Sequence, residues 1–496
     1  MNIIENIKSQ TAEELLKWEQ PSIAIGIIKD GEVVLADAFG EVEIATGRKP
    51  NADTLYQIGS CSKAFTAAAC AILVDQGKLE WDKPVRSYMP WLKFQDSYTS
   101  ENVTVRDLLC HRTGLPRHDA YWINGKCTRR EMAENLRNMQ AAWPFRTEWC
   151  YQNTCYVAAG MLIEEISGMT WEKFLQKEIL DPLSMDRTYF YIDQMCADEN
   201  YAKPYQRPLP LDTTGIVPAK FLKFDDESWE NGVGAPFGPA GSIISTINDM
   251  CKWVKMLLNN GKVGDIQVIS EENTKILMKP SMLLSAPLLM DCPEMEFHSY
   301  ALGWFTETYR GHKMVEHGGN IDGFTALVSM IPDMNLGVIC LVNFNDSFNT
   351  YATSYEIIDR YLGVENGDWH NRQRVFLTEA FAEAVAGMKA MNAPKLEGTS
   401  PTHPIDDYIG TYKNTCYGDF VVTKNGDDLS LAYNKCDYEL LHYHYDTYLL
   451  RNQVGLFDGM TLKFNTGNDG KIGEIQFAIV LNPAAKDELF SKVVEV

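Results

Sequence analysis

The sequence contains no surplus of basic residues. Its 496 residues include 45 Lys and Arg against 67 Asp and Glu, which gives a formal net charge of -22 at pH 7. Nucleic-acid binding requires a basic surface that neutralises phosphates, so this balance argues against a nucleic-acid partner. We interpret the acidity as a contribution to solubility.

Long apolar runs are also missing. The longest have the length of a β-strand, which is too short to cross a bilayer. The first twenty residues, MNIIENIKSQTAEELLKWEQ, mix acidic with apolar residues and lack the apolar core of a secretory signal. The sequence therefore predicts a cytoplasmic protein that does not interact with membranes.

Cysteine motifs are missing as well. The 12 cysteines include no Cys-x-x-Cys pair and no tight Cys/His cluster, and the closest pair is Cys150 and Cys155. Without a secretory signal we expect reduced, mostly buried thiols. Neither a metal ion nor an organic cofactor is expected.

Two histidine groups are alternative candidates for metal binding. His111 and His118 flank a turn next to Asp119, and His442 and His444 alternate along a predicted strand. A structural turn and one face of a β-barrel explain the two groups without a metal ion.

The chain divides into a large and a small part. Its length exceeds one ordinary core, and the stretch NAPKLEGTSPTHPI at 392–405 has the composition of a linker. Short alternating runs after it predict an antiparallel β-barrel at 406–496. We therefore assign 1–365 to a main domain and 366–405 to a helix and linker.

Hydrophobic periodicity predicts both helices and strands in the main domain. A β-hairpin is expected at 22–40, and the weak pattern at 192–235 indicates an irregular region over a cleft. Thr104 and Thr246 begin two helices as N-caps. The predicted helices are 60–77, 103–111, 154–168, 246–261, 350–362 and 370–391, and the predicted strands are 300–308, 312–316, 324–331 and 335–343.

The stretch QIGSCSKAFTAAAC at 57–70 carries a candidate nucleophile. Residues three apart lie on one face of a helix, so Lys63 is expected beside the hydroxyl of Ser60. An amine with a lowered pKa can act as the base that activates a serine. The alternative is that Ser60 is a helix N-cap and Lys63 a solvated residue.

Two further motifs favour the catalytic interpretation. Tyr151-Gln152-Asn153 precedes a predicted helix, and His317-Gly318-Gly319 follows a predicted strand. A second Tyr-x-Asn at 412–414 lies beyond the linker. The order of the motifs along the chain, rather than any one of them, carries the information.

With these motifs the chain resembles the serine β-lactamase and penicillin-binding-protein superfamily. The closest resemblance is to its class C β-lactamase-like branch, which includes D-peptidases and esterases. The segments VTVRDLLCHRTGLPRH, GPAGSIISTINDMCKWVKMLLNNGK, YALGW and EHGGNIDGFTALVSMIPDMNLGVICLVN carry it over about residues 10–365.

The resemblance implies an α/β (α+β) fold. An antiparallel sheet, built from the first and last parts of the main domain, would be flanked by helices and interrupted by a mostly helical insertion at about 85–240. Ser60 would lie at their junction. The C-terminal barrel resembles the lipocalin-like appendages of some relatives, and its role could be to cover the cleft, form a pocket wall or join subunits.

The resemblance also implies catalytic roles. Ser60 would be the acylated nucleophile and Lys63 its base. Tyr151, with a phenol pKa lowered by nearby cations, would pass a proton to the leaving group, and Asn153 would bind the substrate.

The remaining implied residues belong to the third motif. His317 takes the place of the Lys in the Lys-Thr-Gly motif of many relatives, and the backbone N–H groups of Ser60 and Asn320 would form an oxyanion hole. Gly318 and Gly319 would leave room for substrate along the strand.

The chain departs from penicillin-recognising relatives at this third motif. It contains no Lys-Thr-Gly, and a histidine is mostly neutral near pH 7. This argues against efficient penicillin hydrolysis. A Ser-x-Asn occurs at 347–349, but out of order, and is interpreted as coincidence.

Other residues near the motifs have two interpretations. The aromatic residues Tyr121, Trp143, Trp149 and Trp229 either pack in the core or line an apolar substrate pocket. Cys61 adjoins Ser60, so its oxidation could inhibit the protein.

The resulting hypothesis is a serine hydrolase that cleaves a small amide, D-amino-acid peptide or ester through an acyl-serine intermediate. An esterase or D-aminopeptidase fits best. The alternatives are a true β-lactamase, an acyltransferase, or a non-catalytic member that binds ligands or forms assemblies. A homo-oligomer is possible.

Overall fold

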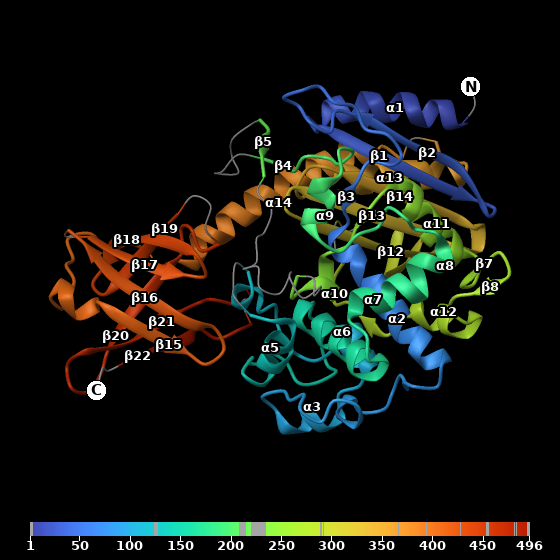
Figure 1. Ribbon diagram of the computed structural model, residues 1–496. Helices are drawn as coiled ribbons and strands as arrows, with labels where there is room; N and C mark the ends of the chain where they lie inside the picture. Colours follow the sequence, from blue (N-terminus) through green and yellow to red (C-terminus); the bar gives the residue numbers. More distant parts are fainter. Residues whose placement is uncertain are drawn as a thin grey trace.

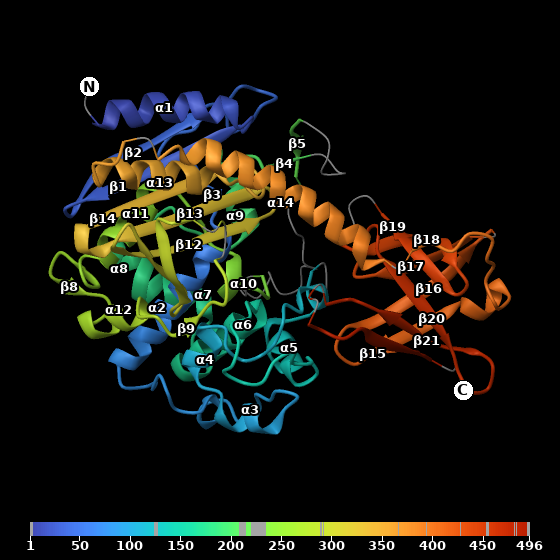
Figure 2. The same ribbon diagram turned by 180° about the vertical axis from the view of Figure 1, so that it is seen from behind.

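The computed structural model describes most of the chain as one large domain joined to a β-barrel (Figures 1 and 2). Trp229, one of the aromatic residues named above, and part of the region predicted to be irregular lie outside the described residues. Described are residues 3–123, 127–207, 215–219, 235–287, 290, 292–365, 367–392, 394–426, 428–452, 456–480, 482 and 484–493.

An eight-stranded antiparallel sheet organises the main domain. Its strand order is β2-β1-β14-β13-β12-β11-β10-β9, so the N-terminal hairpin pairs with the last strand and closes a discontinuous sheet, as predicted. The strands are β1 Ser22–Lys29, β2 Glu32–Gly40, β9 Met282–Leu283, β10 Met295–Tyr300, β11 Phe305–Tyr309, β12 His312–Ile321, β13 Phe324–Ile331 and β14 Leu336–Val342.

Both faces of the sheet are covered by helices, which explains its continuous apolar strands. Alternate residues of β1 enter different cores: Ile23 and Ile25 join one cluster, and Ala24 and Ile28 join the other. One face carries α1 Ile3–Lys17, α13 Asn349–Tyr361 and α14 Trp369–Met391, and the other carries α2 Ser62–Asp75 and α11 Ile247–Leu258 (Figure 2).

The sequence misplaced two strand boundaries. The predicted strand 300–308 is two strands, because β10 ends at Tyr300 and a turn containing Gly303 at φ +82° precedes Phe305. The predicted strand 312–316 continues to Ile321, so the glycines lie inside β12 rather than after it. Glycine is a turn signal in most contexts, which is why the sequence ended the strand too early.

The segment between α2 and α11 is mostly helical, as predicted. Thr104 caps α4 in a capping box with Asp107, and Gly168 at φ +71° ends α6. The helices are α3 Ser97–Asn102, α4 Val105–Leu109, α5 Arg129–Glu134, α6 Asn153–Ser167, α7 Trp171–Leu175, α8 Asp181–Leu183, α9 Ile192–Ala197 and α10 Gly238–Gly241.

Short elements complete the main domain. Helix α12 covers Glu271–Leu277. Three two-stranded ladders pair β3 Tyr56–Gln57 with β6 Ile244–Ser245, β4 Tyr205–Gln206 with β5 Val217–Pro218, and β7 Lys262–Val263 with β8 Ile266–Gln267.

The C-terminal domain is an antiparallel β-barrel, as predicted, and the structure shows that it is closed and has eight strands. Helix α14 leads from the main domain to it, and the barrel also lies beside α5 of the helical segment (Figure 1). Its strands are β15 Gly410–Asn414, β16 Gly418–Asn425, β17 Asp428–Tyr433, β18 Cys436–His444, β19 Thr447–Arg451, β20 Thr461–Thr466, β21 Ile472–Phe477 and β22 Glu488–Lys492.

None of the 12 cysteines, all of which lie in the described part of the chain, forms a disulfide bond. Among the residues that the structure describes, no helix is both long and apolar enough to cross a lipid bilayer.

A buried ion-pair network joins the helices of the insertion. The Arg129 guanidinium, 3% exposed, lies 2.6 Å from carboxylate oxygens of both Glu164 on α6 and Glu172 on α7. It also donates to the carbonyl of Ala235, just before α10. A buried charge is tolerated only when its partners are present, so this residue fixes three helices relative to one another.

We predict that Arg129→Leu lowers the free energy of unfolding by about 3–5 kcal/mol, because it leaves Glu172 buried without its cation. The matched control is Arg130→Leu, which removes the two ion pairs of a neighbouring side chain that is 41% exposed and should cost about 1 kcal/mol or less. Urea unfolding of both variants measures the difference. Equal losses would contradict the prediction.

Candidate active site

The candidate nucleophile lies in a tight turn that touches the sheet. Residues Gly59–Cys61 form a 3-10 turn that leads into α2, so Ser60 precedes the helix rather than lying in it. Gly59 has φ +49°, and a Cβ there would lie 2.9 Å from the backbone nitrogen of Asn320. Strand β11 pairs with β12 only as far as Glu316, and beyond that point β12 packs against this turn.

The two glycines of β12 permit close packing. A Cβ on Gly319 would lie 2.0 Å from the carbonyl oxygen of Ile58 and 2.8 Å from the nitrogen of Ser60. A Cβ on Gly318 would lie 2.5 Å from the hydroxyl of Tyr351, on the other side of the sheet. Contact between the strand and its own neighbours is thus sufficient to require glycine at both positions, and room for substrate stays a prediction.

Cys61 fastens the turn to the strand. Its Sγ donates to the carbonyl of His317 at 3.1 Å, and the residue is 2% exposed. Burial raises the pKa of the thiol to about 12. The suggested sensitivity to oxidation is thus wrong for the folded state, because a buried neutral thiol is poorly reactive.

The Lys63 amine lies between three oxygen atoms. Its Nζ is 3.0 Å from Ser60 Oγ, 2.8 Å from Asn153 Oδ1 and 2.7 Å from the carbonyl of Ala240. The last two are acceptors only. A neutral amine has two hydrogens for them and one lone pair, which is left for the Ser60 hydroxyl.

Burial keeps this amine close to neutrality. Lys63 is 0% exposed. Desolvation lowers its pKa well below the usual value, the Arg117 guanidinium lowers it further, and the Asp119 carboxylate opposes both. The predicted proximity of Ser60 and Lys63 is confirmed by the 3.0 Å distance, and burial rather than the helix dipole is the first cause of the shift.

Sequence reasoning missed the role of Asp119. Its Oδ1 accepts a hydrogen bond from Asn153 Nδ2 at 3.1 Å, which fixes the amide so that Asn153 Oδ1 faces Lys63. Its Oδ2 accepts from Arg117 at 2.7 Å. The sequence considered Asp119 only as a metal ligand, since nothing in the chain order shows that it meets Asn153.

Tyr151 lies beside the amine but has the opposite pKa shift from the one expected. Lys63 Nζ lies 4.7 Å from the centre of its ring, and the Arg117 guanidinium 5.5 Å from it. Burial raises the phenol pKa, while a hydrogen bond with Ser60 and the charge of Arg117 lower it by less. Burial outweighs both the hydrogen bond with Ser60 and the charge of Arg117, so the phenol is protonated.

His317 is neutral and its ring is fully engaged. Its Nδ1 lies 2.6 Å from the carbonyl of Gly318, which can only accept, and its Nε2 lies 2.9 Å from the hydroxyl of Tyr300. Nδ1 therefore carries the proton, and Nε2 accepts from Tyr300. Burial, and then the neighbouring Lys63, lower the pKa of His317 to about 3.

Aromatic rings pack around these groups. His111 lies 4.3 Å from Tyr151 and 4.8 Å from Tyr300 between ring centres, and Trp149 lies 5.8 Å from Phe305. His111 Nδ1 also accepts from the backbone of Gln152. Trp149 thus belongs to the aromatic wall of the site.

The other aromatic and polar candidates have structural contacts. The Trp143 carbonyl packs against Gly114, and Tyr121 packs in a cluster around Trp122 and Phe237. Ser347 and Asn349 both donate hydrogen bonds to Gln20. These structural contacts agree with the interpretation that the Ser-x-Asn at 347–349 is a coincidence.

Three of the four histidines considered for metal binding, His111, His118 and His442, have hydrogen-bond partners in the protein. His118 bonds Tyr417 and the carbonyl of Gln140, and His442 bonds the carbonyl of Tyr445. Over the described ranges, no group of three or more His, Cys, Asp and Glu side chains is arranged to hold a metal ion.

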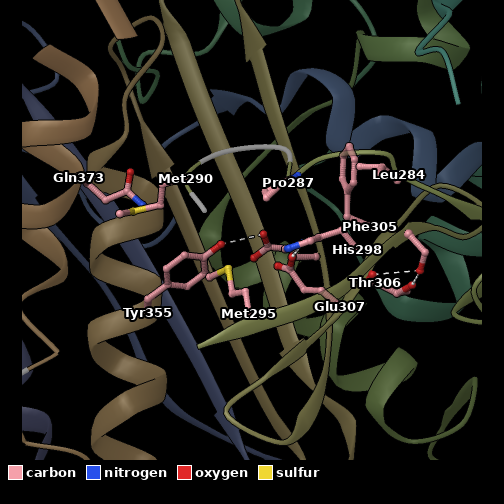
Figure 3. A pocket seen from close by; sticks show the side chains of 12 residues that line it. Leu284, Pro287, Met290, Met295, His298, Phe305, Thr306, Glu307, Tyr355 and Gln373 are labelled. Atoms are coloured by element: carbon pink, nitrogen blue, oxygen red, sulfur yellow. Dashed lines mark hydrogen bonds and ion pairs between the residues drawn. The ribbon is translucent and has the colours of Figure 1, made fainter. Parts of the chain in front are cut away.

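A small cavity lies on the far side of β12 from Lys63. Figure 3 shows Tyr355 and Gln373 on its helix side and Leu284, His298 and Phe305 on its strand side. Its volume, about 20 Å³, holds about one water molecule. It therefore does not fit a substrate.

A buried carboxyl group lines the same cavity. Glu316, next to His317 in β12, accepts from Tyr355 and Ser329. Burial, and then the neighbouring Glu307, raise its pKa to about 8. A protonated carboxyl here carries no charge into the sheet, which fits its position inside the core.

Two family models match the chain. One described as Beta-lactamase matches residues 9–359, and one described as Domain of unknown function (DUF3471) matches residues 394–492. The chain is 29% identical over 446 residues to Unguisins hydrolase ungD of Aspergillus violaceofuscus, covering 83% of this chain and 75% of the relative. It is 24% identical over 352 residues to Protein flp of Staphylococcus aureus, covering 69% and 64%.

Two solved structures share the fold. The octameric penicillin-binding protein homologue from Pyrococcus abyssi has a TM-score of 0.61 at 23% identity, covering 99% of this chain and 100% of that one. A structure titled "Crystal structure of SurE" has a TM-score of 0.57 at 17% identity, covering 99% of both. At these identities the likeness concerns the fold alone.

We predict that, in the His317→Gln variant, the free energy of unfolding falls less steeply than in the parent as the pH is lowered from 6 to 5. The unfolded chain protonates this histidine near pH 6.5, but the folded protein does so only near pH 3. The contribution of His317 to the free energy of unfolding is therefore fully present above pH 6.5. It falls by about 1.4 kcal/mol for each pH unit as the pH is lowered from 6.5 towards 3. Urea unfolding at pH 6.0, 5.5 and 5.0 measures the slope. A variant with the parental slope would show that the histidine protonates in the folded state.

Proposed function

The chain belongs to the Beta-lactamase family, and from that premise we propose that it is a serine hydrolase of small amides or esters. Ser60 is the nucleophile, and the reaction passes through an acyl-serine intermediate that water hydrolyses. The names of two relatives, both unguisins hydrolases, favour hydrolysis over acyl transfer.

One observation carries the proposal: the buried Lys63 amine touches Ser60 Oγ and two acceptors that use both its hydrogens. Its lone pair therefore faces the hydroxyl proton. In the first step this proton moves to Nζ while Oγ bonds to the substrate carbonyl carbon. The resulting ammonium keeps three acceptors, so the charge that forms is stabilised where it appears.

Tyr151 acts as a neutral acid in this scheme. Its raised pKa keeps the phenol proton available, and the phenol donates it to the leaving nitrogen or oxygen as the tetrahedral intermediate collapses. The Lys63 ammonium, whose Nζ lies 4.7 Å from the centre of the Tyr151 ring, then returns a proton to the phenolate directly, because the esterified Ser60 Oγ carries no hydrogen. Water then attacks the acyl group, and the same two residues transfer protons in the reverse direction.

The oxyanion is assigned to two backbone donors. Gly59 and Gly319 bring the nucleophile turn and β12 close together: a Cβ on Gly59 would lie 2.9 Å from the nitrogen of Asn320, and one on Gly319 would lie 2.8 Å from the nitrogen of Ser60. Such fixed dipoles stabilise the negative oxygen of the tetrahedral intermediate. Asn153 is assigned first to Lys63, and the second hydrogen of its Nδ2 can bind a substrate carbonyl.

His317 argues for substrates other than penicillins. Its ring is neutral, and both nitrogens already have partners, so it supplies no fixed cation for a substrate carboxylate. The nearest assigned cation is Arg117, whose charge is shared with Asp119. We therefore propose short esters and D-amino-acid amides or peptides as the substrate class.

The first prediction concerns the nucleophile. A fluorophosphonate probe should add to the parent at Ser60, as intact mass and peptide mapping measure, and Ser60→Ala should abolish the adduct. Lys63→Ala should slow labelling by at least about a hundredfold, because the base is lost. Nitrophenyl esters and D-amino-acid amides should be turned over much faster than nitrocefin.

Two results would contradict this assignment. Labelling of Ser60→Ala at the parental rate would exclude Ser60, and a folded parent that no acylating probe labels would favour a non-catalytic ligand-binding member. Rapid nitrocefin hydrolysis would instead restore the true β-lactamase as the function.

The second prediction concerns the two charges near the amine. Arg117 lowers the pKa of Lys63 and Asp119 raises it, and the rate rises with pH as Lys63 loses its proton. Arg117→Gln should move the acid limb of the pH–rate profile to higher pH, and Asp119→Asn to lower pH. The shifts should be fractions of a pH unit, because Arg117 is 59% exposed and water screens it. Shifts in the same direction would contradict Lys63 as the titrating base.

A further inference from the structure

The C-terminal barrel contacts the segment that positions the Lys63 amine. Hydrogen bonds from two barrel hairpins end on residues 118–123, and Asp119 lies in that segment. We propose that the barrel is a positioning element of the active site, acting through Tyr417, Tyr433 and Asn434. The inference rests on the proposed function and gives the barrel a role within it.

One contact comes from the turn between β17 and β18. Asn434 and Lys435 both have positive φ, 45° and 62°, and Tyr433 pairs with Cys436 across them, which makes a two-residue hairpin turn. The turn points Asn434 at the main domain, where its Nδ2 lies 3.0 Å from the carbonyl of Ala120. The same Nδ2 lies 3.3 Å from the carbonyls of Tyr121 and Ile123.

The neighbouring hydroxyl strengthens this contact. Tyr433 OH donates to the carbonyl of Ala120 at 2.9 Å, and the bond is buried. Asp119–Tyr121 form a single 3-10 turn, and a turn of this length has carbonyls without partners in the element itself. The barrel supplies those partners, so the turn depends on it for part of its order.

A second contact comes from the turn between β15 and β16. The Tyr417 hydroxyl lies 2.5 Å from His118 Nδ1, and His118 Nε2 lies 3.2 Å from the carbonyl of Gln140. That carbonyl can only accept, so Nε2 carries the proton and Nδ1 accepts from Tyr417. Burial lowers the pKa of His118 to about 4, which keeps this arrangement at neutral pH. Asn135 donates to the carbonyl of Cys416 in the same turn.

Asp119, in the segment that the barrel contacts, links this segment to the Lys63 amine through Asn153. Asp119 Oδ1 accepts from Trp122 Nε1 at 3.0 Å and from Asn153 Nδ2 at 3.1 Å. An amide can rotate by 180° and exchange its donor for its acceptor. The fixed carboxylate prevents this rotation, so Asn153 Oδ1 stays 2.8 Å from Lys63 Nζ. A loose segment would release the amide and admit water to the amine.

The test removes only the barrel's polar contacts. In Tyr417→Phe/Tyr433→Phe/Asn434→Gly, the glycine tolerates the positive φ of the turn. We expect fluorophosphonate labelling of Ser60 to slow about tenfold at pH 7, since small displacements of catalytic groups have large effects on rate. Water near Lys63 should raise its pKa, so the acid limb should move to higher pH and the defect should shrink as pH rises. Amide hydrogen exchange should increase in 118–123.

The matched control changes the opposite end of the barrel. Tyr445→Phe/Asn468→Gly lies in the turns after β18 and β20 and should leave labelling, pH profile and exchange at parental values. Parental labelling in the triple variant at every pH would overturn the proposal. So would a loss of rate that is equal at every pH, since that is the result of general damage rather than of a displaced base.

The experiment separates this inference from the proposed function. If the parent itself is not labelled at Ser60, the hydrolase assignment fails, and exchange alone decides the positioning role. Faster exchange at 150–154 as well as 118–123 in the triple variant would then support the link from the barrel to Asn153. Unchanged exchange at 150–154 would overturn it.

Discussion

The site depends on one buried amine that is surrounded by oxygen acceptors. Removing an ammonium group from water is costly, so a lysine at this depth loses its proton readily. The carbonyl of Ala240 and the amide oxygen of Asn153 take its two hydrogens, and the remaining lone pair meets the Ser60 hydroxyl. Asp119, the Arg129 network and the close packing of the nucleophile turn on β12 help to bring these oxygens to the amine.

The three oxygen atoms around the amine come from distant parts of the chain. Ser60 belongs to a turn that packs on β12, Asn153 begins α6, and Ala240 lies in α10. The buried Arg129 network fixes α6 and the segment before α10 relative to each other. Glycines allow the turn and the strand to touch. The amine is therefore positioned by the packing of the whole insertion against the sheet.

Much of this architecture could be predicted from the sequence, since hairpins, capped helices and alternating strands are local patterns. The pairing of Ser60 with Lys63 followed from a spacing of three residues. Apart from two misplaced strand boundaries, the predictions that were wrong concern the surroundings of individual side chains. The pKa of Tyr151 is raised rather than lowered because burial outweighs the hydrogen bond with Ser60 and the charge of Arg117. Cys61 is buried against the strand rather than exposed.

The sequence alone predicted the order of the elements, the division into a main domain and a barrel, and the candidate nucleophile and base. It did so because periodicity, capping and short spacings act between residues that are close along the chain. Only the tertiary structure decided which groups surround the amine: Asp119 behind Asn153, a neutral His317 bonded to Tyr300, and barrel side chains on the segment that carries Asp119. Desolvation and hydrogen-bond geometry depend on distances in space, and the residues concerned lie up to about three hundred positions apart in the chain.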